Sequence, residues 1–337
     1  MQEAYLYQKL PGNKVKCRNC AHYCLVEPGK RGICGVRENI AGNLFALNYQ
    51  KMAAINIDPI EKKPFFHFLP GTHSLSVAAA GCNFSCKNCQ NYDISQEFKN
   101  TGEILGEDLS PEQVVIIALK NNLPSISYTY VEPTVFLEYA LETMKIARQK
   151  GLKNAWVSNG FMSPEAADLI IPYLDAVNID IKSFSEEFYR SVCGARLQPV
   201  LETAALMKKS GVWLEITTLA IPTLSDSKET FQDIAAFVKN KLGEETPWHI
   251  SRFSGAVSWQ LRDLPDTPAE TLKTAWQIGK QAGLKYVYTG NLPGLPYEDT
   301  FCPSCRALAI DRTGYLIFRH DKSGKCPKCG ENLNLIE

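Results

Sequence analysis

Cysteine placement is the feature that most constrains what this chain can fold into. Of its twelve cysteines, eleven fall into three groups and only Cys193 stands alone. In a reducing compartment, close spacing is more typical of metal ligands than of disulfides, and a secreted disulfide scaffold would be far shorter than 337 residues. We therefore expect metal sites at the three groups, which are Cys17, Cys20, Cys24 and Cys34; Cys82, Cys86 and Cys89; and Cys302, Cys305, Cys326 and Cys329.

Charge and hydropathy argue against several functions. The 36 basic residues balance the 36 acidic ones, so no global field gathers nucleic acid or anionic lipid. The longest apolar runs are too short and too polar to span a bilayer. Residues 1–10 lack the cationic start and apolar run of a signal peptide. We therefore expect a cytoplasmic protein that binds neither nucleic acid nor membrane.

The middle of the chain alternates between strand-like and helical segments. β-Branched and aromatic runs predict strands, and capped amphipathic segments predict helices, such as 111–121 with Ser110 as its N-cap and Pro111 at its first position. Strands are predicted at 75–80, 126–130, 155–157, 176–181, 213–221 and 248–253, with a further candidate at 286–288. Helices are predicted at 111–121, 135–149, from 164, at 199–209, 230–241 and 268–282.

This alternation predicts an α/β fold. Units of about 35 residues indicate right-handed crossovers and a parallel sheet. About six units are too few for a closed eight-fold barrel, so we expect a partial (β/α)6 barrel with its chemistry at the carboxyl ends of the strands. We divide the chain into a cysteine-rich extension (1–60), the barrel (61–295) and a metal-binding ribbon (296–337), which the breaker-rich segment 291–296 introduces.

Cys82, Cys86 and Cys89 form a CxxxCxxC loop directly after the first barrel strand. Thiolates are soft ligands that suit zinc or iron–sulfur clusters. A structural zinc site closes with four ligands, whereas three thiolates on one loop fit a [4Fe–4S] cluster whose fourth iron stays open. The alternative is a zinc site completed by a distant histidine.

At this point the sequence resembles the radical S-adenosylmethionine (SAM) enzymes. The resemblance implies that the open iron binds the amino and carboxylate groups of SAM. It also implies that one electron from the cluster cleaves SAM to methionine and a 5′-deoxyadenosyl radical, which abstracts hydrogen from a substrate.

The resemblance continues at three further strand ends and implies the SAM-binding residues. Tyr130, Val131 and Glu132, followed by proline, stand in the place of the family's GGEP segment, which holds the SAM amino group. Asp180 and Lys182 match the DxK of pyruvate formate-lyase-activating enzymes, in which the lysine pairs with the SAM carboxylate.

Two more positions follow from the same resemblance to the activating enzymes. Ser158 and Asn159 match their TNG segment, and Ser254 aligns with their ribose-contacting histidine. Val157 replaces the aspartate of their monovalent-cation site, so we do not carry that site over.

More narrowly, the chain is similar over nearly its whole length to the radical SAM proteins of the AmmeMemoRadiSam system. This resemblance implies relatedness to the activating enzymes without supplying a substrate. The segments that carry it are 20–24, 29–37, 58–64, 89–91, 193–196 and 248–253.

The two outer cysteine groups differ in regularity. Cys302, Cys305, Cys326 and Cys329 form two CPxC knuckles, which indicate a closed four-thiolate site, most often zinc and sometimes a single iron. We expect this tail to fold separately from the barrel, and its loss would lower substrate turnover only if the tail helps to close the barrel mouth. Cys17, Cys20, Cys24 and Cys34 are less regular, and both zinc and a second iron–sulfur cluster stay open for them.

The sequence thus favours a radical SAM enzyme whose substrate is unknown, with a glycyl-radical-activase-like protein modification as one possibility. The partners it implies are an electron donor such as flavodoxin or ferredoxin, and a protein substrate or partner proteins of the same system. The alternative is a zinc-binding scaffold without redox catalysis.

Overall fold

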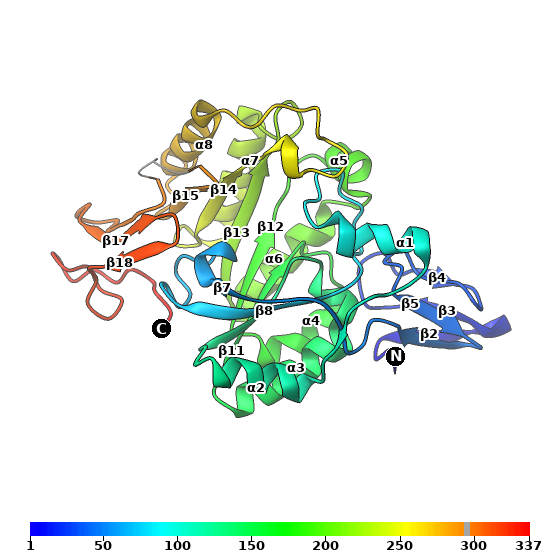
Figure 1. Ribbon diagram of the computed structural model, residues 1–337. Helices are drawn as coiled ribbons and strands as arrows, with labels where there is room; N and C mark the ends of the chain where they lie inside the picture. Colours follow the sequence, from blue (N-terminus) through cyan, green and yellow to red (C-terminus); the bar gives the residue numbers. More distant parts are fainter. Residues whose placement is uncertain (293–296) are drawn as a thin grey trace.

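The computed structural model describes residues 1–292 and 297–337 (Figure 1). Most of the predicted linker 291–296, and the predicted boundary between residues 295 and 296, lie outside these residues. Within the described ranges, no helix is long and apolar enough to cross a membrane.

A nine-stranded sheet forms the centre of the molecule, in the order β15-β14-β13-β12-β11-β10-β8-β7-β9. Seven of its strands are parallel and follow one another in chain order, which confirms the α/β partial barrel and the seventh candidate strand. These strands are β8 (His73–Ala79), β10 (Ser125–Tyr128), β11 (Lys153–Ser158), β12 (Ala176–Asp180), β13 (Trp213–Ala220), β14 (Trp248–Arg252) and β15 (Val287–Gly290).

Helices on the outer face connect the parallel strands, as Figure 1 shows. Helix α2 begins as predicted, because Ser110 and Gln113 form a capping box and Pro111 occupies the first turn. The helices are α1 (Phe98–Thr101), α2 (Pro111–Lys120), α3 (Leu137–Gln149), α4 (Pro164–Ile170), α5 (Glu186–Phe188), α6 (Gln198–Lys209), α7 (Lys228–Phe237) and α8 (Ala269–Gln281).

The sheet begins earlier in the chain than the predicted barrel. Strand β7 (Lys51–Pro59) pairs antiparallel with β8, and the short β9 (Glu107–Asp108) pairs with β7. An aromatic run then seals the bottom of the barrel, where the parallel strands begin. Phe65 and Phe68 are fully buried against Ala155 and Ala176, the inward-facing residues at the start of β11 and β12.

The N-terminal extension packs at the opposite end, where the parallel strands finish. Its residues form two small antiparallel sheets, and the chain around Cys20 pairs with Met162 in the loop after β11. The strands are β1 (Gln2–Glu3), β2 (Tyr7–Leu10), β3 (Lys14–Cys17), β4 (Leu25–Val26), β5 (Arg37–Ile40) and β6 (Asn43–Ala46).

The C-terminal ribbon lies at the barrel bottom, far from the N-terminal extension (Figure 1). Its sheet contains β16 (Thr300–Phe301), β17 (Leu308–Thr313) and β18 (Leu316–Arg319). The aromatic run spans residues 65–68. The backbone of Ile336 donates to the carbonyl of His67 in this run and accepts from the amide of the adjoining Leu69, both at 2.8 Å. The buried Arg312 donates to the carbonyl of Phe66 at 2.8 Å. The tail therefore braces the end of the barrel opposite the mouth and does not help to close the mouth.

Candidate active site and metal centres

The loop of Cys82, Cys86 and Cys89 follows β8 at the carboxyl end of the barrel. Gly81 turns the chain into this loop with φ +110°, a conformation that a residue with a side chain rarely adopts. Backbone hydrogen bonds then fix the loop from both sides. Ser85 donates to Cys193 at 2.9 Å, and Trp259 donates to Cys89 at 3.1 Å. Segments distant in sequence therefore hold the three cysteines in place.

The three thiols fit a multi-iron cluster better than a single ion. Burial raises the pKa of Cys82 and Cys89, so thiolates here need a cation to balance their charge. Four thiolates about 2.3 Å from one tetrahedral ion would lie about 3.8 Å apart. Among the residues that the structure describes, these sulfur atoms do not form a group within 4.8 Å of one another. In a cluster each thiolate binds a different iron, so wider spacing is expected.

Lys182 reaches the same region from the end of β12. Its ammonium lies 2.7 Å from Asp180, and 15% of its side chain is exposed. Although burial lowers the pKa of Lys182, the charge of Asp180 raises it overall, well above its usual value. Lys182 is therefore a permanent cation beside the cysteine loop, as the binding of a carboxylate requires.

Glu132 joins the ends of β10 and β11. The oxygens of its buried carboxylate accept hydrogen bonds from the Ser158 hydroxyl at 3.0 Å, from the Asn159 amide at 2.7 Å and from Thr134. Asn159 in turn donates to the side chain of Asn83, inside the cysteine loop, at 2.7 Å. The structure thus brings together Glu132, Ser158 and Asn159, and it gives Glu132 a bracing role between two strand ends.

Tyr130 adopts a left-handed backbone, with φ +66°, at the place where the family segment has glycine. Its carbonyl accepts from Asn91 at 2.8 Å, and its hydroxyl donates to Asp58. Asp58 also pairs with the buried ammonium of Lys63 at 2.7 Å, which lies 4.1 Å from the centre of the Tyr130 ring. These contacts offset the strain of a non-glycine residue here. Val131, which follows, is buried.

Ser254 follows β14, three strands away from Ser158. The loop that it begins returns to the cysteine loop, where Ser258 donates to the Lys87 carbonyl at 3.2 Å and Gln260 does so at 2.7 Å. Trp259 lies parallel to Tyr92, with ring centres 6.3 Å apart. Ser254 therefore belongs to a segment that covers the cysteine loop, which sequence reasoning did not foresee.

Other residues of the site were also missed. Cys193, which stands outside the three cysteine groups in the sequence, is fully buried beside Cys86. On the inner face of the barrel, Asn178 Oδ1 and Thr217 Oγ1 are buried and have no hydrogen-bond partner among the described residues. The signal that could have revealed Asn178 and Thr217 is a polar residue at inward positions of otherwise apolar strands.

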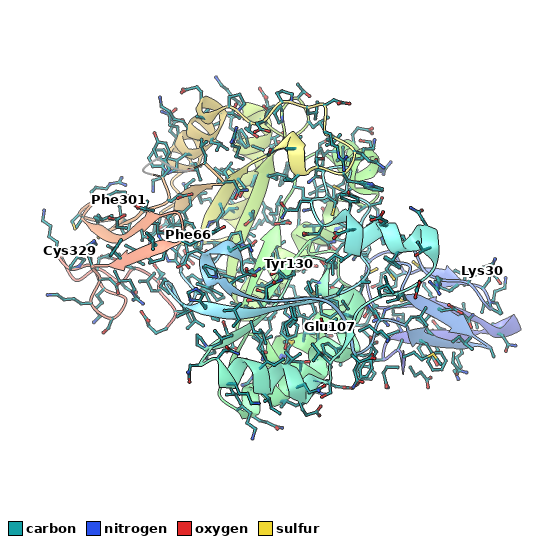
Figure 2. All side chains as sticks on the ribbon, in the orientation of Figure 1. Lys30, Phe66, Glu107, Tyr130, Phe301 and Cys329 are labelled. Atoms are coloured by element: carbon teal, nitrogen blue, oxygen red, sulfur yellow. The ribbon has the colours of Figure 1, made fainter. Side chains whose placement is uncertain are left out.

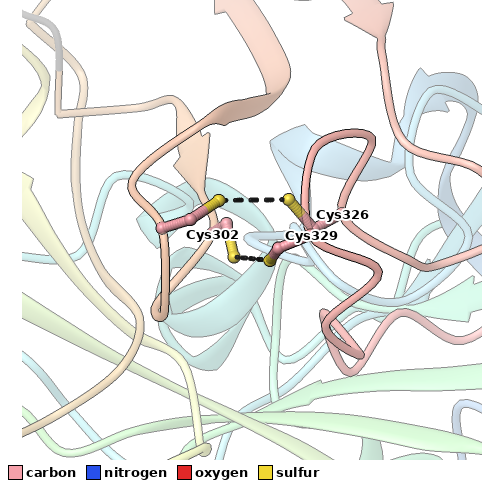
Figure 3. Close-up of side chains that lie close together, drawn as sticks. Cys302, Cys326 and Cys329 are labelled. Atoms are coloured by element: carbon pink, nitrogen blue, oxygen red, sulfur yellow. Dashed lines mark hydrogen bonds between the residues drawn. The ribbon is translucent and has the colours of Figure 1, made fainter.

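The C-terminal cysteines have the geometry of a single-ion site (Figure 3). Cys302 and Cys329 have sulfur atoms 3.6 Å apart, and Cys305 and Cys326 have theirs 3.5 Å apart. All four lie within 4.8 Å of one another. These distances exceed a disulfide of about 2.05 Å and agree with tetrahedral coordination of one metal ion.

The N-terminal cysteines come together on two turns. Cys17 donates a backbone hydrogen bond to Cys24 at 2.9 Å. A Cβ atom at Gly32 would lie 3.7 Å from the Cys24 sulfur, and the turn from Gly32 continues directly to Cys34. Unlike the C-terminal group, these cysteines form no set of three within 4.8 Å among the described residues.

Comparisons with known proteins agree with this geometry. The sequence profile of the radical SAM superfamily matches residues 77–238. An uncharacterised protein of Methanocaldococcus jannaschii is 44% identical over 339 residues, which cover 100% of both chains. The pyruvate formate-lyase-activating enzyme of Clostridium pasteurianum is 23% identical over 218 residues, which are 60% of this chain and 88% of that enzyme.

Among solved structures, SuiB of Streptococcus suis, determined bound to S-adenosylmethionine, has a TM-score of 0.50. It is 11% identical, and the match covers 63% of this chain and 49% of SuiB. A likeness at this identity concerns the fold alone, and it agrees with the partial barrel described above.

Proposed function

This chain belongs to the radical SAM superfamily and is an enzyme of that type, and from this premise we propose that it cleaves SAM at a [4Fe–4S] cluster held by Cys82, Cys86 and Cys89. When bound, the cluster supplies the one electron that breaks SAM into methionine and a 5′-deoxyadenosyl radical, which takes hydrogen from the substrate. The observation that carries the proposal is the half-buried loop of three cysteines at the carboxyl end of the barrel, with the ammonium of Lys182 beside it.

The chain's own residues would orient SAM. We assign Lys182 to the SAM carboxylate, because it is the permanent cation at this strand end. Since Ser158, Asn159 and Thr134 already donate to the Glu132 carboxylate, Glu132 would act mainly by bracing the ends of β10 and β11, next to Tyr130 and Val131, which would bind the SAM amino group. Ser254 and its loop would shield the adenosyl end from water.

The substrate would present a polar group to the inside of the barrel. Among the residues that the structure describes, Asn178 Oδ1 and Thr217 Oγ1 have no hydrogen-bond partner, and leaving such buried groups unpaired is costly. A substrate amide or hydroxyl would satisfy them. Similarity to the pyruvate formate-lyase-activating enzyme favours a protein segment as this substrate, in an activase-like modification.

The test is an anaerobic incubation of iron–sulfur-reconstituted protein with SAM and dithionite. We expect equal amounts of 5′-deoxyadenosine and methionine by mass spectrometry. Protein with a full cluster content that forms no deoxyadenosine would refute the proposal. Colourless protein that contains zinc alone would support the zinc-scaffold alternative.

A further inference from the structure

We propose that Cys17, Cys20, Cys24 and Cys34 hold a second iron–sulfur cluster, and that this cluster passes electrons to the cluster on Cys82, Cys86 and Cys89. The presence of a second cluster is inferred from the N-terminal geometry alone. Electron transfer to the SAM cluster also rests on the proposed function, so the cluster and the transfer are tested by separate experiments.

The choice of cluster over zinc follows from the sulfur spacing. One tetrahedral ion needs its four thiolates about 3.8 Å apart, as the C-terminal group has them. Among the described residues, the N-terminal sulfurs do not reach such an arrangement and resemble the CxxxCxxC loop in this respect. Four cysteines that lie on adjoining turns but whose sulfurs do not converge as the C-terminal four do suit a centre with several irons.

The two groups are in direct backbone contact. A Cβ atom at Gly81 would lie only 3.3 Å from the carbonyl oxygen of Cys34, and Gly81 immediately precedes Cys82. His22, between Cys20 and Cys24, bonds the carbonyl of Asn83, which follows Cys82, at 2.8 Å. Electron tunnelling falls steeply with distance, so this contact is the short path that a relay needs.

A buried ion pair fixes that contact. Arg37 donates two hydrogen bonds to Glu138 of α3, at 3.0 and 2.6 Å, and both side chains are almost completely buried. Arg37 is the first residue of β5 and directly follows the turn, residues 32–36, that contains Cys34. Because breaking a buried pair by removing one partner is strongly destabilising, this pair ties the turn to α3.

The other side of the group faces solvent. Cys20 and Cys24 are partly exposed. Leu25, next to Cys24, is 59% exposed, and Ile33, next to Cys34, is 53% exposed. A protein electron donor can therefore approach the N-terminal cluster from this side. The segment that follows Ser254 contacts the loop of Cys82, Cys86 and Cys89 on another side, at the carbonyls of Lys87 and Cys89.

Each SAM cleavage uses one electron from the donor. One electron leaves a reduced flavodoxin- or ferredoxin-type donor, reduces the N-terminal cluster, and passes to the SAM cluster. There it is consumed when the sulfur–C5′ bond of SAM breaks. The donor is oxidised by one electron for each SAM cleaved.

The cluster itself is tested in the full-length variant with Cys82→Ala, Cys86→Ala and Cys89→Ala. Lacking the SAM cluster, the reconstituted variant should keep iron and inorganic sulfide, together with one zinc, and its reduced form should give an iron–sulfur electron paramagnetic resonance (EPR) signal. Two zinc ions and no iron would overturn the proposal whether or not the wild type cleaves SAM. The matched control, Cys326→Ser with Cys329→Ser, should lose zinc and keep all of its iron.

The relay is tested by comparing two reductants. In Cys17→Ser with Cys34→Ser, the ratio of flavodoxin-driven to dithionite-driven deoxyadenosine formation should fall at least tenfold, because dithionite is small enough to reach the SAM cluster directly. An unchanged ratio would overturn the relay. A second measurement needs no variant: in fully reduced wild-type protein the two EPR signals should broaden each other through space. Two unbroadened signals would contradict the close placement.

Discussion

The two outer cysteine groups each contain four cysteines, yet they lie at opposite ends of one barrel. Figure 2 shows Lys30, from the N-terminal group's region, and Cys329 at opposite ends of the molecule, with Tyr130 between them. The N-terminal group contacts the loop of Cys82, and among the described residues no three of its sulfurs lie within 4.8 Å of one another. The four C-terminal sulfurs all lie within 4.8 Å of one another, and two pairs of them are 3.5 and 3.6 Å apart. The N-terminal group lies at the carboxyl ends of the parallel strands, where it can take part in the chemistry. The C-terminal group lies at the ends where these strands begin, and there it braces the fold.

The largest expected effect is on the loop between these two ends. Replacing Cys82, Cys86 or Cys89 singly by Ala should abolish deoxyadenosine formation, because each supplies one of the three thiolates that the loop offers to the cluster. The measurement is deoxyadenosine yield rather than iron content, since the N-terminal group also binds iron in our account. Activity that survives in any single variant would show that the site is misassigned.

The next effect falls on the C-terminal end. Cys326→Ser with Cys329→Ser should remove one metal ion per chain and lower the unfolding free energy by several kcal/mol, because a structural zinc contributes about 10 kcal/mol or more to small domains. Since the ribbon braces the aromatic run through Ile336 and Arg312, the melting temperature of the whole chain should fall. Calorimetry and metal analysis measure both. A full metal content in this variant would contradict the site.

A smaller effect is expected at the SAM-binding end. Lys182→Ala should weaken SAM binding about tenfold to a hundredfold, because a charge-assisted hydrogen bond contributes about 1.5–3 kcal/mol. The cluster spectrum should be unchanged, and Lys182→Arg should restore most of the affinity. Equilibrium binding of SAM to the correctly folded variant measures this. Unchanged affinity would remove Lys182 from the site.

The smallest effect concerns pH at the barrel bottom. Burial lowers the pKa of His67 to about 4, against about 6.5 in the unfolded chain. At pH 5 the unfolded chain therefore binds a proton that the folded one does not, and stability should fall by about 2 kcal/mol between pH 7 and pH 5. The carboxyl of Glu215 has its pKa lowered to about 2 and loses its contribution only below this window.

Denaturant titrations at the two pH values measure that loss, and His67→Gln is the matched control. Its pH dependence over the same range should shrink by a similar amount. If the variant and the wild type lose equal stability, His67 is not the titrating group.

Local signals were enough to predict most of the barrel. The capping box at Ser110, the alternation of strands and helices, and the cysteine loop after the first parallel strand each depend on neighbours in sequence. Strand β7 was not predicted to join the sheet, because pairing with β8 depends on a partner across a turn and an aromatic plug. Family resemblance supplied Glu132, Ser158 and Asn159, which the structure brings into one hydrogen-bonded set.

The sequence could not predict how the N-terminal and C-terminal extensions pack against the barrel. Nothing local places the ribbon at the barrel bottom or the Cys34 turn against Gly81, since those contacts join residues tens to hundreds of positions apart. The left-handed Tyr130 is a similar case. Its conformation is tolerated only because Asp58, Lys63 and Asn91 hold its side chain and carbonyl.

The most direct test of the account is whether SAM binds to an iron that the three cysteines leave open. Reduced protein is mixed with SAM labelled with ¹⁵N at the amino group and studied by electron–nuclear double resonance. The account predicts a nitrogen coupling to the cluster on Cys82, Cys86 and Cys89, and its loss in Cys82→Ala. A cluster signal that is unchanged by SAM, in protein that binds SAM at equilibrium, would contradict it.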